Sequence, residues 1–203
     1  MKKQFLLITS IFFIFTYSFS QTKEITLEDI WTKYLFYPSN VPGFKPMPKG
    51  DFYTVKTKYE IASYYFKTGE KHEQIVSNND IKSASNNAIE LKDVQIYQLD
   101  KDEKYLLIGT QVESIYRRSF KAFYYIYNLT TKKLFPLSDT AKGKQSFADF
   151  SFDGNKIAFV RDNNLFVADI INHTETAITT DGKYNYVLNG IADWVYEEEL
   201  HMS

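Results

Sequence analysis

The sequence predicts an all-β protein built from β-propeller blades of four antiparallel strands. A strand–connection–strand–turn–strand pattern occurs three times, and its copies are spaced by about 50 residues. Aromatic residues make up 17% of the chain, and flat rings pack well on pleated sheets. Because three copies leave the edges of a propeller ring open, we expect about three blades of a larger propeller. A short helix is expected separately, at the three glutamates close to the C-terminus.

Residues 1–20 are predicted to be a signal peptide. A Lys-Lys pair opens the chain, residues 5–15 form an apolar run too short to span a bilayer comfortably, and the Ser-Phe-Ser triplet at 18–20 favours cleavage before Gln21. An uncleaved membrane anchor is the alternative. The chain has no cysteine for lipid attachment. The mature protein is therefore expected to be periplasmic or secreted, without a membrane anchor.

Residues 21–48 are predicted to lead into the propeller domain, which is assigned to residues 49–203. In this leading segment, Thr26 stands three residues before Asp29, a spacing that is typical of a capped helix start. The proline-rich stretch 41–48 is expected to run extended without regular strand pairing, since proline lacks a backbone N–H.

The three copies supply the predicted strands of the blades. Each copy contains three strands separated by turn residues, and a preceding apolar segment provides a fourth strand for the second and third copies. The predicted strands are residues 50–55, 60–66 and 72–76 in the first copy, 94–99, 105–108, 122–127 and 134–137 in the second, and 147–152, 157–160, 165–168 and 176–179 in the third.

Three consecutive glutamates, Glu197, Glu198 and Glu199, follow a Trp-Val-Tyr stretch near the end of the sequence. Adjacent like charges repel, so such a cluster suits a place where a cation is held, and a free ammonium group is the obvious candidate. A solvated acidic start of a helix is the alternative interpretation.

The segment 193–199, Asp-Trp-Val-Tyr-Glu-Glu-Glu, resembles the double-glutamate motif of the dipeptidyl peptidase IV family. In that family the last two glutamates of the triplet grip the free N-terminus of the peptide substrate. The resemblance assigns this role to Glu198 and Glu199. It places Glu197 outside the pair, so replacement of Glu197 is expected to cost less.

The second copy carries an extra segment between residues 108 and 122. Its stretch 116–120, Tyr-Arg-Arg-Ser-Phe, resembles the family's loop with a substrate-contacting arginine, and Arg117 takes that place, while Arg118 stands where relatives often have histidine. A guanidinium there could donate paired hydrogen bonds to a peptide carbonyl. Two solvated arginines on a hairpin are the alternative.

The resemblance implies an eight-bladed propeller followed by a C-terminal α/β-hydrolase domain, which is absent from this chain. No Gly-x-Ser-x-Gly motif occurs, so we assign no catalytic residue and expect the chain to be inactive alone. The implied function is substrate recognition in an exported serine-type dipeptidyl peptidase that removes dipeptides, with proline at the second position. A tripeptidyl or other exopeptidase propeller and a non-catalytic binding propeller remain as alternatives, and homodimerisation stays open.

The amino-acid composition limits which partners and which metal or disulfide sites the protein can have. The formal net charge of −1 gives no reason to expect nucleic acid as a partner. Without cysteine, disulfides and Cys-based zinc sites are excluded. His72, His173 and His201 lie far apart without metal-ligand spacing, so we assign no metal and no cofactor.

Overall fold

The computed structural model describes residues 24–38 and 43–201. The chain divides into two compact units, Met1–Val41 and Pro42–Ser203. The predicted signal peptide at residues 1–20 lies outside the described residues.

The first unit contains helix α2 (Leu27–Trp31), which begins where the sequence predicts. The Thr26 hydroxyl accepts the Asp29 N–H at 3.1 Å, and the Asp29 carboxylate accepts the Thr26 N–H at 3.4 Å, so the capping box is present. Lys33 adds an ion pair to Asp29 one turn later, at 3.1 Å.

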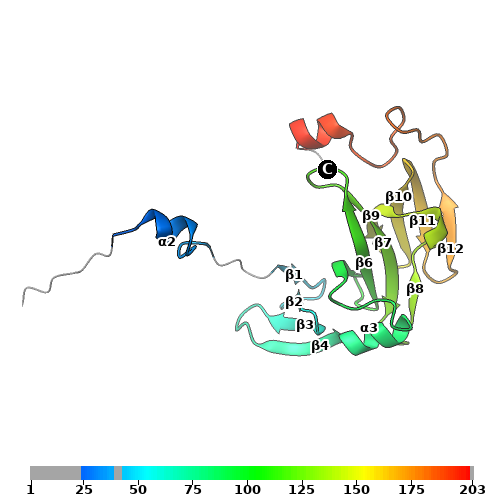
Figure 1. The fold of residues 1–203 in the computed structure, drawn as a ribbon. Coiled ribbons are helices and arrows are strands. Elements are labelled where there is room, and N and C mark those ends of the chain that lie inside the picture. The colour runs from blue at the N-terminus through cyan, green and yellow to red at the C-terminus, as the bar shows by residue number, and fades with distance from the viewer. Residues whose placement is uncertain (1–23, 39–42, 202–203) are drawn as a thin grey trace, which may run out of the picture. The chain divides into compact units, whose positions relative to one another are not determined.

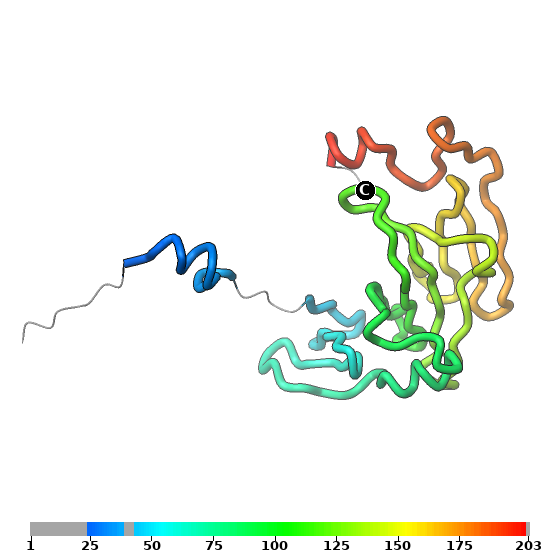
Figure 2. The backbone as a smooth tube through the Cα atoms, viewed as in Figure 1, coloured from blue at the N-terminus to red at the C-terminus, as the bar shows by residue number. Residues whose placement is uncertain are grey.

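The second unit consists of three successive four-stranded antiparallel meanders (Figure 1), which confirms the prediction of four-stranded blades. In Figure 2 the chain passes from the first meander (cyan) through the second (green) to the third (yellow and orange). The strands are β1 (Phe44–Pro46), β2 (Phe52–Lys56), β3 (Glu60–Tyr65) and β4 (Lys71–Ser77); β5 (Val94–Leu99), β6 (Tyr105–Ser114), β7 (Phe120–Asn128) and β8 (Leu134–Pro136); and β9 (Gln145–Phe150), β10 (Lys156–Arg161), β11 (Asn164–Asp169) and β12 (Thr174–Ala177).

The second and third meanders are joined into one eight-stranded sheet, because β7 pairs with β9 over a short antiparallel stretch. The first meander forms a separate four-stranded sheet. Neither sheet closes on itself among the described strands, as expected for part of a larger propeller.

The expectation that residues 41–48 stay unpaired is wrong in one part. Phe44–Pro46 forms β1, which pairs with β2 and places Pro46 opposite Tyr53. A strand at the edge of a sheet tolerates proline because one of its sides needs no N–H donor. The first sheet therefore begins before the predicted domain boundary at residue 49.

Helix α3 (Asn78–Ala84) follows β4 and was not predicted. Ser77 caps it, since its hydroxyl accepts the Asp80 N–H at 3.1 Å and its own N–H donates to the Asp80 carboxylate at 2.9 Å. This Ser-x-x-Asp spacing is a variant of the capping box, and it is the feature of the sequence that indicates the start of this helix. Ile81 of the helix is fully buried in the core.

Alternate residues of β6 enter two different hydrophobic clusters. Leu106 and Ile108 lie in a cluster with Ile61 of the first sheet, whereas Leu107 lies in another with Ile157 of the third meander. Successive side chains of a strand point to opposite faces, so both faces of the second meander are covered. Each such buried side chain contributes about 1.5–3 kcal/mol, and this stacking holds the meanders together.

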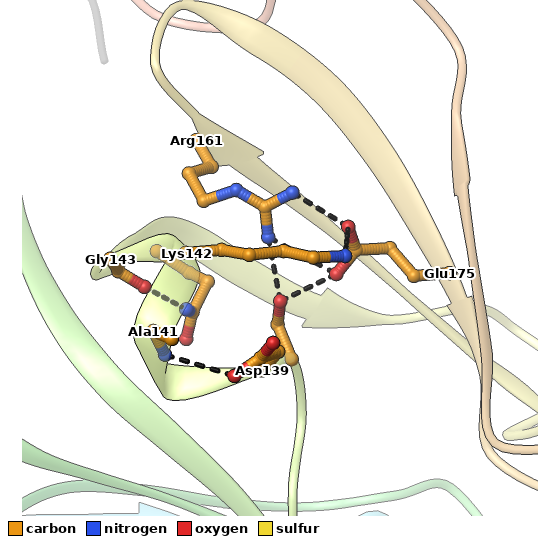
Figure 3. Close-up of polar contacts among 8 residues, drawn as sticks. Asp139, Ala141, Lys142, Gly143, Arg161 and Glu175 are labelled. Carbon is orange, nitrogen blue, oxygen red and sulfur yellow. Dashed lines mark hydrogen bonds and ion pairs between the residues drawn. The ribbon is translucent and has the colours of Figure 1, made fainter.

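A buried arginine ties the third meander together (Figure 3). Arg161, at the end of β10, is 7% exposed and binds Glu175 of β12 through Nη2–Oε1 at 2.6 Å and Nη1–Oε2 at 3.1 Å. It also donates to Ser138 Oγ at 2.6 Å, and its guanidinium lies 4.3 Å from the centre of the Phe166 ring. The hydrogen bond from Arg161 is the main reason that the pKa of Glu175 falls to about 2.

Candidate functional site

The extra segment between residues 108 and 122 is an extended hairpin. Strand β6 continues to Ser114 and β7 begins at Phe120, with a register shift between Thr110 and Glu113. The Ile115 N–H donates to the Ser119 carbonyl at 2.9 Å and closes the tip. The hairpin therefore presents the two arginines at its end, close to the C-terminal segment that is red in Figure 1.

The glutamates lie on a short π-helix, η2 (Val195–Glu199), at the position where a short helix was predicted. Asp193 begins this turn: its carboxylate accepts the Tyr196 N–H at 2.9 Å and its carbonyl accepts the Glu197 N–H at 3.0 Å. The Trp194, Val195 and Tyr196 side chains are each about half exposed, at 51, 50 and 51%, so they do not anchor the turn in a core of this chain.

The structure brings Arg117 and Glu198 together across 81 residues of sequence. The Glu198 carboxylate accepts the Arg117 backbone N–H at 2.8 Å and pairs with Arg117 Nε at 3.3 Å. The Glu198 side chain is 16% exposed and that of Arg117 is 63% exposed. The ion pair thus lies at the surface, with the guanidinium open to solvent.

Glu197 is the buried member of the triplet, at 2% exposure. Its Oε1 accepts the backbone N–H groups of Arg118 and Ser119, at 2.6 and 2.9 Å. Burial raises the pKa of Glu197, but the Ser119 side chain and these backbone N–H groups together lower it below its usual value. Glu197 is therefore buried against the hairpin tip, and the sequence-based expectation that its replacement costs less than replacement of Glu198 or Glu199 stays a prediction.

Glu199 is the last residue of the π-helix, and Arg118 follows Arg117 at the hairpin tip. Glu199 is exposed on the turn. Arg118 donates from Nη1 to the His201 carbonyl at 3.0 Å, so its side chain ties the hairpin to the residues just beyond the turn. We call Arg117, Arg118, Glu197, Glu198 and Glu199 the charged cluster; its three carboxylates and two guanidinium groups give a formal net charge of −1.

A hollow of about 680 Å³ lies beside this cluster. Tyr116 of the hairpin, Tyr186 and the half-exposed Trp194 and Tyr196 contribute to its lining. The glutamates do not line it. The charged cluster and the aromatic hollow are adjacent, and the turn at residues 193–196 separates them.

Across residues 24–38 and 43–201, no group of histidine and carboxylate side chains has the geometry of a metal site. Over the same residues, no helix has the length and apolar character needed to cross a membrane.

A family model for the dipeptidyl peptidase IV (DPP IV) N-terminal region matches residues 100–203, a range that includes both the hairpin and the acidic turn. The chain is 30% identical over 183 residues to prolyl endopeptidase FAP of Bos taurus, across 89% of this chain and 22% of that protein. It is 40% identical over 101 residues to the probable dipeptidyl-aminopeptidase B of Talaromyces stipitatus, across 49% of this chain and 11% of that protein.

Two further relatives extend the likeness. Inactive dipeptidyl peptidase 10 of Rattus norvegicus is 34% identical over 106 residues, across 51% of this chain and 13% of that protein. The crystal structure of Porphyromonas gingivalis dipeptidyl peptidase 4 matches with a TM-score of 0.76 and 36% identity, over 90% of this chain and 25% of that one. The chain thus spans a quarter or less of the length of these relatives.

Proposed function

Because the chain belongs to the dipeptidyl peptidase IV family, as a match over half of its length to the family's N-terminal region indicates, we propose that it receives the free N-terminus of a peptide substrate in a serine-type dipeptidyl peptidase. The finer assignment is release of dipeptides, with proline at the second position. The solved relative from Porphyromonas gingivalis, a dipeptidyl peptidase 4, supports the release of dipeptides, and the preference for proline rests on the resemblance to the family.

The observation that carries the proposal is the net negative charge beside Arg117. The five side chains of the charged cluster have a formal net charge of −1, which favours one bound cation, and a peptide's terminal ammonium has the right charge and three N–H donors. Glu198 and the exposed Glu199 are the proposed acceptors. Arg117, at 63% exposure, has N–H groups available for a peptide carbonyl next to that ammonium.

The proposed contribution to catalysis is positioning. Holding the ammonium and the first carbonyl leaves only a short stretch of peptide to reach a nucleophile, so the distance from the N-terminus selects the bond that is cleaved. The nucleophile itself would belong to an α/β-hydrolase domain elsewhere in the complete protein. Specificity comes from an ion pair that only a free N-terminus completes.

Export is part of the proposal. The Lys-Lys pair and short apolar run of residues 1–20 support a cleaved signal peptide and a periplasmic or secreted protein. Association of two copies stays open.

The test measures kcat/KM in the complete protein with a chromogenic substrate that carries a free N-terminus. Glu198→Gln and Glu199→Gln each remove a charge while keeping the size of the side chain. A hydrogen bond to a charged group contributes about 1.5–3 kcal/mol, so kcat/KM should fall about ten- to a hundredfold. Glu113→Gln is the matched control, since Glu113 lies on the same hairpin in exposed lysine pairs and should change little.

N-acetylation of the substrate removes its positive charge. Wild type and the two glutamine variants should then cleave the acetylated peptide equally and poorly. Equal cleavage of free and acetylated peptides by wild type, or a loss in Glu113→Gln as large as that in Glu198→Gln, would overturn the assignment.

A non-catalytic peptide-binding propeller is the second candidate, and the likeness to a protein named inactive dipeptidyl peptidase 10 favours keeping it. In that case the complete protein would turn over no substrate. It would still bind a free N-terminal peptide more tightly than the acetylated form, and Glu198→Gln would remove that preference.

A further inference from the structure

Two adjacent glutamates accept three consecutive backbone N–H groups at the hairpin tip. Arg117 N donates to Glu198 at 2.8 Å, and Arg118 N and Ser119 N donate to Glu197 at 2.6 and 2.9 Å. Successive N–H groups that point the same way form a concavity for an anion. Here carboxylates of the same chain fill that concavity.

The tip needs these acceptors because its own backbone does not provide them. The N–H groups of Ile115 and Tyr116 both donate to the Ser119 carbonyl, which closes the turn. Among the described residues, no backbone carbonyl accepts the N–H groups of Arg117, Arg118 or Ser119. Ser119 is buried, and a buried N–H without an acceptor is strongly unfavourable.

Glu197 is placed to support this tip and to stay away from substrate. It is 2% exposed and accepts two backbone N–H groups of the tip, while Glu198 and Glu199 stand closer to solvent. Burying a carboxylate is costly, and the two short charge-assisted bonds to Oε1 offset part of that cost, while Oε2 is buried without a hydrogen-bond partner among the described residues. An acidic turn whose only task were solubility would leave this side chain in water.

Building on the proposed function, we propose that Glu197 is a positioning residue for peptide recognition. Its buried carboxylate holds the backbone of Arg118 and Ser119, and this fixes the neighbouring Arg117 beside Glu198. Without Glu197, the tip moves, and the guanidinium no longer stands where the substrate carbonyl arrives. Glu197 acts through Arg117 and does not touch the substrate.

The low pKa of Glu197 agrees with this geometry. The backbone N–H groups of Arg118 and Ser119 favour the ionised carboxylate, so Glu197 remains charged at neutral pH. The ionised carboxylate can therefore accept both N–H groups at neutral pH.

The experiment compares Glu197→Ala, Glu197→Gln, Arg117→Ala and the double variant Glu197→Ala/Arg117→Ala in the complete protein. Misplacing a binding group by about 1 Å can cost up to a hundredfold, so Glu197→Ala should raise KM about ten- to a hundredfold, with a smaller change in kcat. The glutamine retains an acceptor oxygen at the same reach and should recover most of the loss. The double variant should be no worse than Arg117→Ala, within about twofold, because both changes remove one function.

A purely structural role predicts different results. Glu197→Ala would then lower the fraction of active protein and kcat, leave KM unchanged, and add its effect to that of Arg117→Ala. Either additivity or an unchanged KM overturns the positioning role. If Glu197→Ala fails to fold, the KM values of Glu197→Gln and Glu197→Asp are compared instead. The aspartate variant should have the higher KM, because its carboxylate is withdrawn by one methylene. Equal KM values in the two variants would overturn the proposal.

Glu198→Gln and Glu199→Gln are measured in the same series, so the two proposals fail separately. Wild-type kinetics in both would overturn the proposed function. Large losses in both, together with additive Glu197 and Arg117 effects, would overturn the positioning role alone.

Discussion

Replacing Arg161 by methionine should destabilise the chain by about 3 kcal/mol, because it leaves a mostly buried carboxylate without its main partner. Removal of one member of a buried ion pair costs about 3–5 kcal/mol. The remaining contacts of Glu175 with Lys142 and Ser138 place the expected value at the lower end of that range. The lost contact with the Phe166 ring contributes in the same direction.

The pKa of Glu175 supports a similar magnitude. Its value of about 2 in the folded protein, against 4.5 for an ordinary glutamate, corresponds to about 3 kcal/mol. Because the folded pKa is depressed, this stability is fully present above pH 4.5 and is lost as the pH falls toward 2. In Arg161→Met, the loss of stability over this acidic window should be much smaller than in wild type.

The assay is urea unfolding followed by circular dichroism, at pH 7 and at several values down to pH 3. The double variant Arg161→Met/Glu175→Leu should recover most of the stability, since a buried ion pair replaced by apolar side chains is often neutral. Lys82→Met is the control, because Lys82 and Glu90 form a partly exposed pair, and such pairs contribute little to stability. If Arg161→Met cost no more than Lys82→Met, or the double variant were as unstable as the single one, the reasoning would be refuted.

Three further outcomes are expected. Secreted protein should begin at Gln21, and N-terminal sequencing that finds the initiator methionine would contradict the signal peptide. Asp100→Ala should cost about 3 kcal/mol in urea unfolding, because the 2% exposed carboxylate accepts three backbone N–H groups that would lose their acceptor; a cost below about 1 kcal/mol would contradict this. Gly182→Ala should lower the melting temperature, since its new Cβ would clash with the Asn163 carbonyl oxygen, whereas Gly43→Ala, with no atom of the described residues within 4 Å of its new Cβ, should leave it nearly unchanged.

Local patterns predicted the meanders well. Residues 94–99 were predicted as a strand and form β5, and the predicted strands at 157–160 and 165–168 lie inside β10 and β11. Alternation of side chains and turn chemistry act within a few residues, so a single sequence carries this information. The missed helix α3 also had a local signal, the capping by Ser77 and Asp80.

Strand β1 shows where local reasoning fails. Pro46 argues against a paired strand in general, but the prohibition applies only where its missing N–H is needed. Whether a segment lies at the edge of a sheet depends on which strands pair with it, and the composition of the segment does not contain that information.

The features of the candidate site also fall into those that the sequence predicts and those that only the tertiary structure shows. The sequence predicted the four-stranded repeats and the short helix at the glutamates, and its resemblance to the family motif pointed to Arg117, Glu198 and Glu199 as candidate substrate contacts, which stays a prediction. Only the tertiary structure decided that Glu197 is buried under the hairpin tip, 79 residues away in the chain, and that Arg161 pairs with Glu175. Strand pattern and turns depend on near neighbours, whereas the burial and pairing of a charge depend on which distant segments exclude water around it, and that is set when the meanders stack.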